Sequence, residues 1–146
     1  MVRVFIDASV LFAALYSPSG FARDLLRLAI EEKVSLVISQ GVLEEIERNI
    51  VRKAPQVSAY YHSLLATLNL EIISAPPQVA VDQAAAYVAE KDAHVIAAAI
   101  EANPDYLVTY DQKHLLHHPA VSRRSGLTIV TPDIVVAAIL GDDDGS

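Results

Sequence analysis

The sequence of 146 residues contains no cysteine and no tryptophan. The absence of cysteine excludes disulfides, thiolate metal ligands and a cysteine nucleophile, and it is typical of cytosolic proteins. No uncharged apolar run approaches the roughly 20 residues that a membrane-spanning helix needs. The sequence therefore predicts a cytoplasmic protein without a membrane span.

Positive charge is also scarce. The chain has 11 Lys and Arg against 18 Asp and Glu, which gives a formal net charge of −7. This balance argues against a protein that holds nucleic acid mainly by a basic surface, but it allows an enzyme that meets phosphate through a bound metal ion. Aromatic residues make up only 6% and apolar residues 53%. The core is therefore expected to be aliphatic, as in a buried sheet covered by helices.

Short apolar segments alternate with segments of helical periodicity along the chain. Strands are expected at residues 2–6, 34–38, 70–73, 106–109 and 127–130. Helices are expected at residues 10–16, 21–33, 40–53, 55–68, 79–89, from 92 to about 102 and from 132, with a helical turn at 112–116. This alternation predicts a single α/β domain over residues 1–140, with a central parallel sheet of about five strands and helices on both faces. Residues 141–146 are expected to form an acidic, disordered tail.

Four acidic residues are expected to meet at one rim of this sheet. Asp7 directly follows the first strand and Asp111 closely follows the fourth, and ligands of open α/β sheets bind at the carboxyl ends of strands. Asp92 opens a helix and Glu45 lies near the start of the helix after the second strand. Carboxylates gathered in this way repel one another unless a cation neutralises them. Oxygen ligands favour Mg²⁺ or Mn²⁺ over zinc, and one or two ions fit the pattern equally well.

The helix that carries Glu45 also offers Glu44 as a ligand. Val42, Ile46 and Ile50 mark its buried stripe, and Glu45 flanks that stripe whereas Glu44 points more outward. Helix phase thus favours Glu45 without excluding Glu44.

Four segments resemble, in order, the motifs of PIN-domain nucleases. They are VFIDASVL (4–11), SQGVLEEI (39–46), KDAHVIAAA (91–99) and DYLVTYD (105–111). The family spacing, in which a Ser precedes the ligand Glu by six residues, matches Ser39 and Glu45. The helix start at Thr131 and Pro132 also fits. The subgroup that the chain most resembles is the toxin component of type II toxin–antitoxin systems.

This resemblance implies both a site and a function. It implies a catalytic metal site formed by four carboxylates: Asp7, Glu45, Asp92 and Asp111. It implies that Ser9 and Thr109 orient ligands or water, although helix or turn capping explains these two residues equally well. The implied activity is endonucleolytic hydrolysis of single-stranded RNA with Mg²⁺ or Mn²⁺, by a homodimer whose site a cognate antitoxin blocks. Tyr110 departs from the family pattern, in which Gly is frequent, and is expected to affect substrate choice at the entrance to the site.

Basic residues and histidines have alternative interpretations. Arg48, Arg52 and Lys53 share a helix with Glu45, where they either contact RNA phosphate or form a solvated face. Arg123 and Arg124 are expected in a loop, where they too either contact RNA phosphate or face solvent.

The histidines His114, His117 and His118 form a group whose spacing fits no standard zinc site well. His94 is expected to face solvent. Asp133 is interpreted as a helix-dipole residue and Asp105 as a possible neighbour of the site.

Two other classes of protein compete with the enzyme hypothesis. A catalytically inactive relative that binds RNA or a protein partner is consistent with the negative net charge and with Tyr110. A phosphoacceptor receiver domain shares the alternating strands and helices. However, Asp7 stands without an acidic neighbour after the first strand, and no Lys follows the last strand.

Overall fold

The computed structural model describes residues 1–17 and 19–145. Pro18, between the helices expected at 10–16 and 21–33, and Ser146, in the expected tail, lie outside the described residues. Five strands form one parallel sheet in the order β3-β2-β1-β4-β5. Their bounds are β1 Val2–Ile6, β2 Val34–Ser39, β3 Glu71–Ile73, β4 Tyr106–Val108 and β5 Ile129–Val130. The predicted α/β class and parallel sheet are confirmed.

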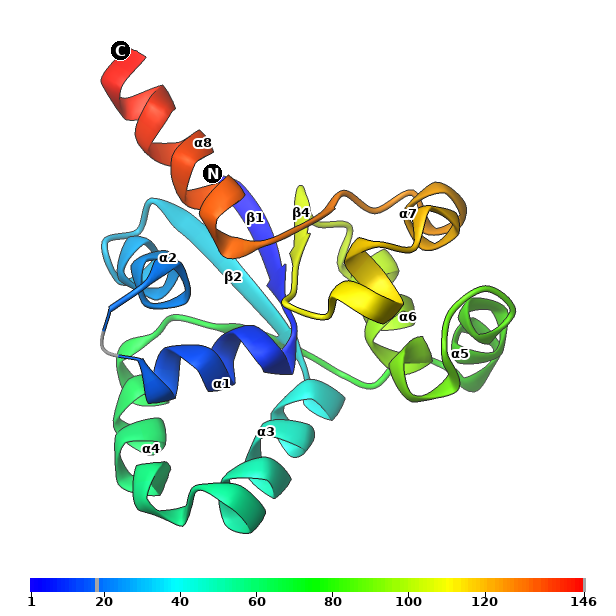
Figure 1. The fold of residues 1–146 in the computed structure, drawn as a ribbon, viewed down its shortest axis with the longest axis horizontal. Helices are drawn as coiled ribbons and strands as arrows, with labels where there is room; N and C mark the ends of the chain where they lie inside the picture. The colour runs from blue at the N-terminus through cyan, green and yellow to red at the C-terminus, as the bar shows by residue number, and fades with distance from the viewer. Residues whose placement is uncertain (18, 146) are drawn as a thin grey trace.

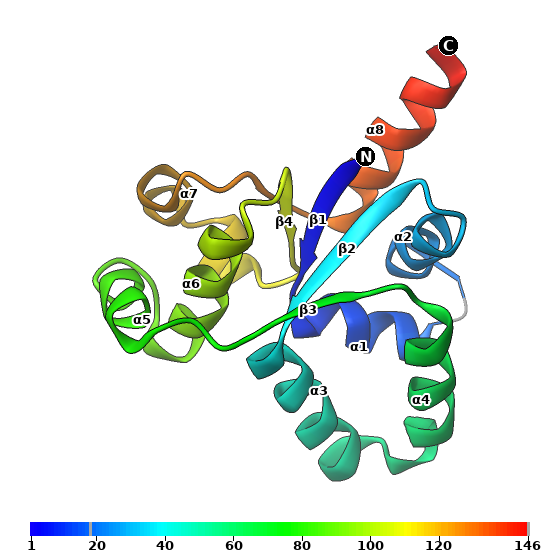
Figure 2. The ribbon, with the colours of Figure 1, turned by 180° about the vertical axis from the view of Figure 1, so that it is seen from behind.

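Helices cover both faces of the sheet. Figures 1 and 2 show α1 (Ala8–Tyr16), α2 (Phe21–Ile30) and α8 (Pro132–Gly145) on one face. The opposite face carries α5 (Gln78–Ala85), α6 (Ala93–Ala102) and α7 (Pro119–Ser125). Beyond the carboxyl end of β2 lie α3 (Gln40–Lys53) and α4 (Ser58–Thr67), which are joined by the 3₁₀ turn η1 (Pro55–Val57).

The core is aliphatic, as the composition predicts. The three central strands bury their apolar side chains on both sides, because helices cover both faces; Phe5, Leu36 and Leu107 are at most 1% exposed. Helix α6 is buried along most of its length, since its many alanines let the backbone approach the sheet closely. It ends at Asn103, whose φ of 49° is left-handed.

Several element boundaries differ from the sequence predictions. Residues 55–68 divide into η1 and α4, and Asp92 belongs to a 3₁₀ turn, η2 (Glu90–Asp92), just before α6. Arg123 and Arg124 lie in α7 rather than in a loop. Pro119 at its start and Gly126 at its end, with φ 76°, are the signals that mark this helix.

At the end of the chain, the backbone of α8 continues through Gly145, past the end expected near residue 140. Extending a formed helix costs far less than starting one.

The strand order places a crevice between β1 and β4. The chain winds from β1 outward to β2 and β3 on one side, and then returns across the sheet to β4 and β5 on the other. Ligands of such sheets bind at the carboxyl ends of the strands where the winding reverses. The backbone N–H of Asp7 donates to the carbonyl of Val108 at 3.0 Å, which fixes these two strand ends together. The residues that follow β1 and β4 therefore share one rim.

Candidate metal centre

A pocket of about 870 Å³ opens at this rim. Its lining includes all four acids that the sequence singles out: Asp7, Glu45, Asp92 and Asp111. They come from the end of β1, the second turn of α3, the turn η2 and the loop after β4. The expected convergence of these side chains is thus seen in the structure.

Asp7 is the most buried of the four acids, with only 8% of its surface exposed. Its Oδ1 accepts a hydrogen bond from the N–H of Ala8 at 2.8 Å and so caps α1. Its Oδ2 accepts from the hydroxyl of Thr109 at 2.8 Å and from that of Ser9 at 3.3 Å. Three donors therefore hold this carboxylate in one orientation.

Ser9 and Thr109 combine the two roles that the sequence left open. The Oγ of Ser9 accepts from the N–H of Tyr110 at 3.0 Å, and the Oγ1 of Thr109 accepts from the N–H of Asp111 at 3.0 Å. Each hydroxyl therefore caps backbone in the β4 loop while its proton is directed at Asp7. Since Thr109 is fully buried, it links two of the four acids through a rigid contact.

Asp111 begins a short π-helical turn, η3 (Gln112–Leu116). Its Oδ1 accepts from the N–H of His114 at 3.0 Å and lies 3.3 Å from Nδ1 of that ring. One potential ligand atom from each of Asp92, Asp111 and His114 lies within 4.8 Å of the others. His114 therefore belongs to the acidic site. Its position three residues after Asp111, on a helical turn, is the signal in the sequence that indicates this role.

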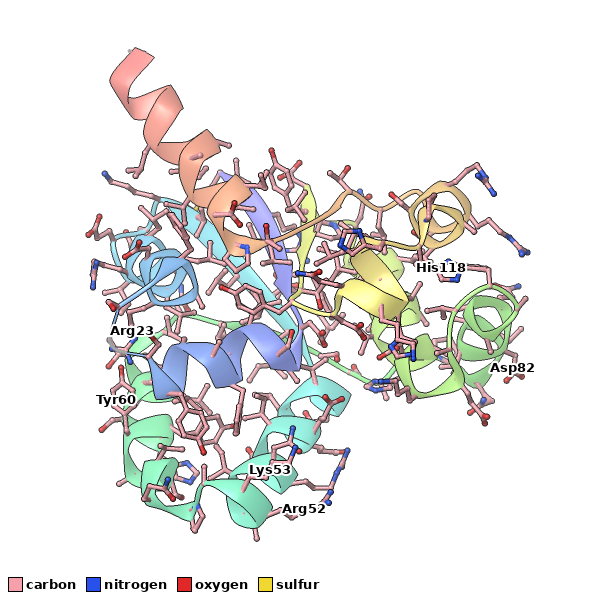
Figure 3. The ribbon with its side chains drawn as sticks, viewed as in Figure 1. Arg23, Arg52, Lys53, Tyr60, Asp82 and His118 are labelled. Carbon is pink, nitrogen blue, oxygen red and sulfur yellow. The ribbon has the colours of Figure 1, made fainter. Side chains whose placement is uncertain are left out.

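The other two histidines of the group lie elsewhere. A ring nitrogen of His117 lies 3.2 Å from Oε1 of Gln112, and His118 lies on the side formed by α5 and α7 (Figure 3). The candidate metal group found among the described residues pairs His114 with acids and includes neither of them.

Glu45, rather than Glu44, faces the acids. Glu44 lines a separate pocket that also includes Gly41. Oε1 of Glu45 lies 4.0 Å from Nε2 of His94, so His94 lines the site and the expectation that it faces solvent is wrong. A Cβ atom on Gly41 would lie 2.9 Å from Nδ1 of His94. The glycine in the second motif therefore makes room for this imidazole.

Burial raises the pKa of Asp7, Glu45 and Asp92, and in each case it is the largest cause. Neighbouring carboxylates raise each of these pKa values further. The hydrogen bonds to Asp7 lower its pKa, and the positive charge of Lys91 lowers those of Glu45 and Asp92. Oδ2 of Asp92 is buried and has no hydrogen-bond partner in the described structure. Repelling carboxylates and an unpartnered buried oxygen together fit a hard divalent cation with oxygen ligands.

Two acids that the sequence placed near strand ends have other roles. Asp105 lies at the amino end of β4, where its Oδ2 accepts from the N–H of Arg3 at 2.8 Å. It is therefore not a neighbour of the site, contrary to expectation. Asp133 lies in the first turn of α8, as predicted for a residue that interacts with the helix dipole.

Tyr110 also lies apart from the acids. It does not line the acidic pocket, and its pKa is raised by burial and by Asp133 and lowered by the N–H of Ala22. Its phenol thus faces the starts of α2 and α8, and an effect of Tyr110 on substrate choice stays a prediction.

Fold and site define the class: an α/β protein with a carboxylate-rich pocket where the winding of a parallel sheet reverses. The family model described as PIN domain matches residues 3–113. The chain therefore belongs to the PIN-domain family, whose members are generally nucleases. No helix in residues 1–17 and 19–145 combines the length and the apolar character needed to cross a membrane.

Two solved structures are similar to the chain in fold. PAE2754 from Pyrobaculum aerophilum matches with a TM-score of 0.67 at 17% identity, covering 96% of this chain and 90% of that one. A chain of VapBC2 from Rickettsia felis, bound to a DNA fragment from their promoter, matches with a TM-score of 0.65 at 18% identity, covering 88% of this chain and 97% of that one. A search of curated proteins gives no match.

Proposed function

We propose that this protein is a metal-dependent endoribonuclease that hydrolyses phosphodiester bonds in single-stranded RNA. The observation that carries the proposal is the convergence of four carboxylates, one with an unpartnered buried oxygen, at the reversal point of a PIN-domain sheet. Repulsion among the ionised members of such a set is relieved when they share a bound cation.

The four carboxylates would hold Mg²⁺ or Mn²⁺: Asp7, Glu45, Asp92 and Asp111. When bound, such an ion supplies charge stabilisation at the phosphate and a water of lowered pKa. The chain's own contribution is orientation. Ser9 and Thr109 fix the Asp7 carboxylate, and Thr109 also holds the backbone that leads to Asp111. His114 lies close enough to share in binding the ion or to position Asp111.

We further propose that the protein is the toxin of a toxin–antitoxin pair, acting in the cytoplasm as a homodimer. The fold likeness to a chain of VapBC2 and the motif resemblance support this role. A cognate antitoxin that inserts into the pocket would block the acids. An antitoxin would be identified by copurification when the flanking genes are coexpressed with this chain.

The proposed activity is tested by comparing the purified protein with its Asp7→Asn variant. We expect Mn²⁺-dependent cleavage of single-stranded RNA by the original protein and loss of cleavage in the variant, with the fold retained by circular dichroism. Asp82→Asn is the matched control, because Asp82 lies on exposed α5 far from the pocket (Figure 3). Equal cleavage by Asp7→Asn would contradict the proposal. Binding of RNA without cleavage by the original protein would favour an inactive binding module.

A further inference from the structure

The acidic pocket has a second wall with the opposite charge. Helix α3 contributes three cationic side chains and one amide to the same lining: Arg48, Asn49, Arg52 and Lys53. The first helix faces them with Phe12, and α1 packs against α3. We call this part of the pocket, between α1 and α3, the α1–α3 groove. The net charge of the chain conceals this local concentration of positive charge.

Two cations of the groove, Arg52 and Lys53, are not engaged by acids of the described residues, whereas the positive charge of Arg48 acts to lower the pKa of Glu45. Two other arginines have partners within the protein: Arg3 forms a bidentate pair with Glu71, and Arg23 donates to the carbonyl of Ala14. In contrast, the side chains of Arg52 and Lys53 are exposed and form no ion pair or hydrogen bond within the described part of the chain. Figure 3 shows both residues at the end of α3. They are therefore available to an anionic ligand.

The spacing of these residues matches a ligand that extends away from the acids. Glu45, Asn49 and Arg52 lie on one side of α3, because residues three or four apart share a helix face. Lys53 lies eight residues after Glu45, which corresponds to about 12 Å along the axis. That length is more than the ~3.4 Å rise per nucleotide of a stacked strand, so these cations can contact more than one phosphate of a bound strand.

One aromatic ring, that of Phe12, lines the opposite wall. Phe12 is only partly buried, and its ring lies edge-on to that of Tyr16 with centroids 4.9 Å apart. The hydroxyl of Tyr16 lies 3.5 Å from the carbonyl of Lys53, which brings the end of α1 to the end of α3. Cations that track a backbone, combined with an aromatic face, form the usual binding surface for unpaired nucleotides.

We propose that the α1–α3 groove binds the stretch of single-stranded RNA next to the bond held at the acids. Phosphates contact Arg48, Arg52 and Lys53, and a base stacks on Phe12. This inference rests on the proposed function. It adds that the substrate strand leaves the acids along the α1–α3 groove. It also explains selectivity for single strands, because paired bases cannot offer their faces to Phe12.

Binding rather than cleavage tests the groove. Affinity for a labelled oligouridine is measured by fluorescence anisotropy over a range of salt concentrations, with the Asp7→Asn protein as background to prevent cleavage. Adding Arg52→Gln and Lys53→Gln should weaken binding on the order of tenfold and lower the salt slope by about 1.4, since each lost phosphate contact removes about 0.7 for single strands. The matched control is Arg27→Gln, whose exposed side chain on α2 pairs only locally with Asp24.

A second variant tests the stacking contact. Replacing Phe12 with Leu keeps an apolar side chain against the core but removes the aromatic face. Binding of oligouridine should weaken roughly 5- to 150-fold, the equivalent of one lost base stack, whereas the salt slope should stay unchanged. A duplex RNA competitor should displace the oligouridine poorly.

The outcomes separate this inference from the proposed activity. Unchanged affinity in the α3 double variant, or an effect equal to that of Arg27→Gln, overturns the groove even if the original protein cleaves RNA. Equal competition by duplex RNA also overturns it. Conversely, loss of affinity in the α3 and Phe12 variants supports the groove even if the original protein fails to cleave, in which case only the proposed activity fails.

Discussion

At the scale of single residues, the acids of this protein divide into two kinds. Glu71, at the start of β3, forms a bidentate pair with Arg3 that lowers its pKa. Asp7 and Asp92 lie at the carboxyl ends of the strands. Burial raises the pKa of each, and no cation paired with either carboxylate among the described residues offsets it. Acids of the first kind serve structure, whereas a cluster of the second kind marks a functional site.

Replacing Thr109 with Val tests the contact that links two of the acids. The valine keeps the buried shape but removes one donor to Asp7 and one acceptor for the N–H of Asp111. We expect the free energy of unfolding to fall by about 1–3 kcal/mol and Mn²⁺ affinity to fall by roughly 10- to 100-fold, measured by denaturation and calorimetry. Thr109→Ser keeps the hydroxyl and should lose much less. Equal losses in both variants would contradict this role of the hydroxyl, because Thr109→Ser retains it.

Replacing Asp92 with Asn tests the raised pKa values. A raised carboxyl pKa means that the metal-free folded protein binds a proton more tightly than the unfolded chain does. Its stabilising contribution is therefore present below the unfolded pKa, near 4, and is lost as pH rises through the folded value. Asn cannot ionise, so the variant should be more stable at neutral pH, by up to about 1 kcal/mol after solvent screening.

The measurement for Asp92→Asn is urea denaturation in EDTA at a series of pH values from 4 to neutral. The original protein should lose stability along this series and the variant should lose less. Asp82→Asn, on exposed α5, should follow the original protein. A variant that is less stable than the original throughout would show that the Asp92 carboxylate is needed for the fold itself.

At the scale of elements, the sequence predicted most of what positions the site. Helix phase favoured Glu45 over Glu44, because local periodicity depends on near neighbours in sequence. The hydroxyl of Ser39 caps the same helix by accepting from the N–H of Val42. His94 was misplaced since its environment comes from Gly41 on another helix. The short α7 was missed because its apolar content is small, although Pro119 and Gly126 mark its ends.

A hydrogen bond between a tyrosine hydroxyl and a carboxylate joins α4 to α3. Tyr61 is 1% exposed and donates to Oε2 of Glu47 at 2.9 Å, and burial with this hydrogen bond raises its pKa. Removing the hydroxyl in Tyr61→Phe should lower the free energy of unfolding by about 1 kcal/mol, measured by chemical denaturation. Tyr60→Phe is the control, because Tyr60 is exposed and its ring contacts Arg23 instead. An equal effect of both changes would rule out an anchoring role for the Tyr61 hydroxyl.

At the scale of the whole molecule, the sequence predicted the fold but not how charge is distributed in space. The parallel sheet followed from the alternation of elements, whereas Arg3, Glu71 and Asp105 are brought together by strand pairing between distant segments. Likewise, a net charge of −7 says nothing of the cations on one side of the pocket. Only three-dimensional placement separates the acids that repel one another from those that are paired.

This distribution leads to a prediction about global stability. A cation that binds the folded acids but not the unfolded chain stabilises the fold, by about 2.7 kcal/mol at a concentration one hundred times its Kd. For a chain of this size, Mn²⁺ should therefore raise the melting temperature by roughly 5–11 °C, measured by calorimetry against NaCl of matched ionic strength. The rise should disappear when Asp7 and Asp92 are both replaced by Asn. A rise that persists in that variant, or that NaCl reproduces, would mean that the cation only screens the acidic surface and that the four carboxylates do not form a specific site.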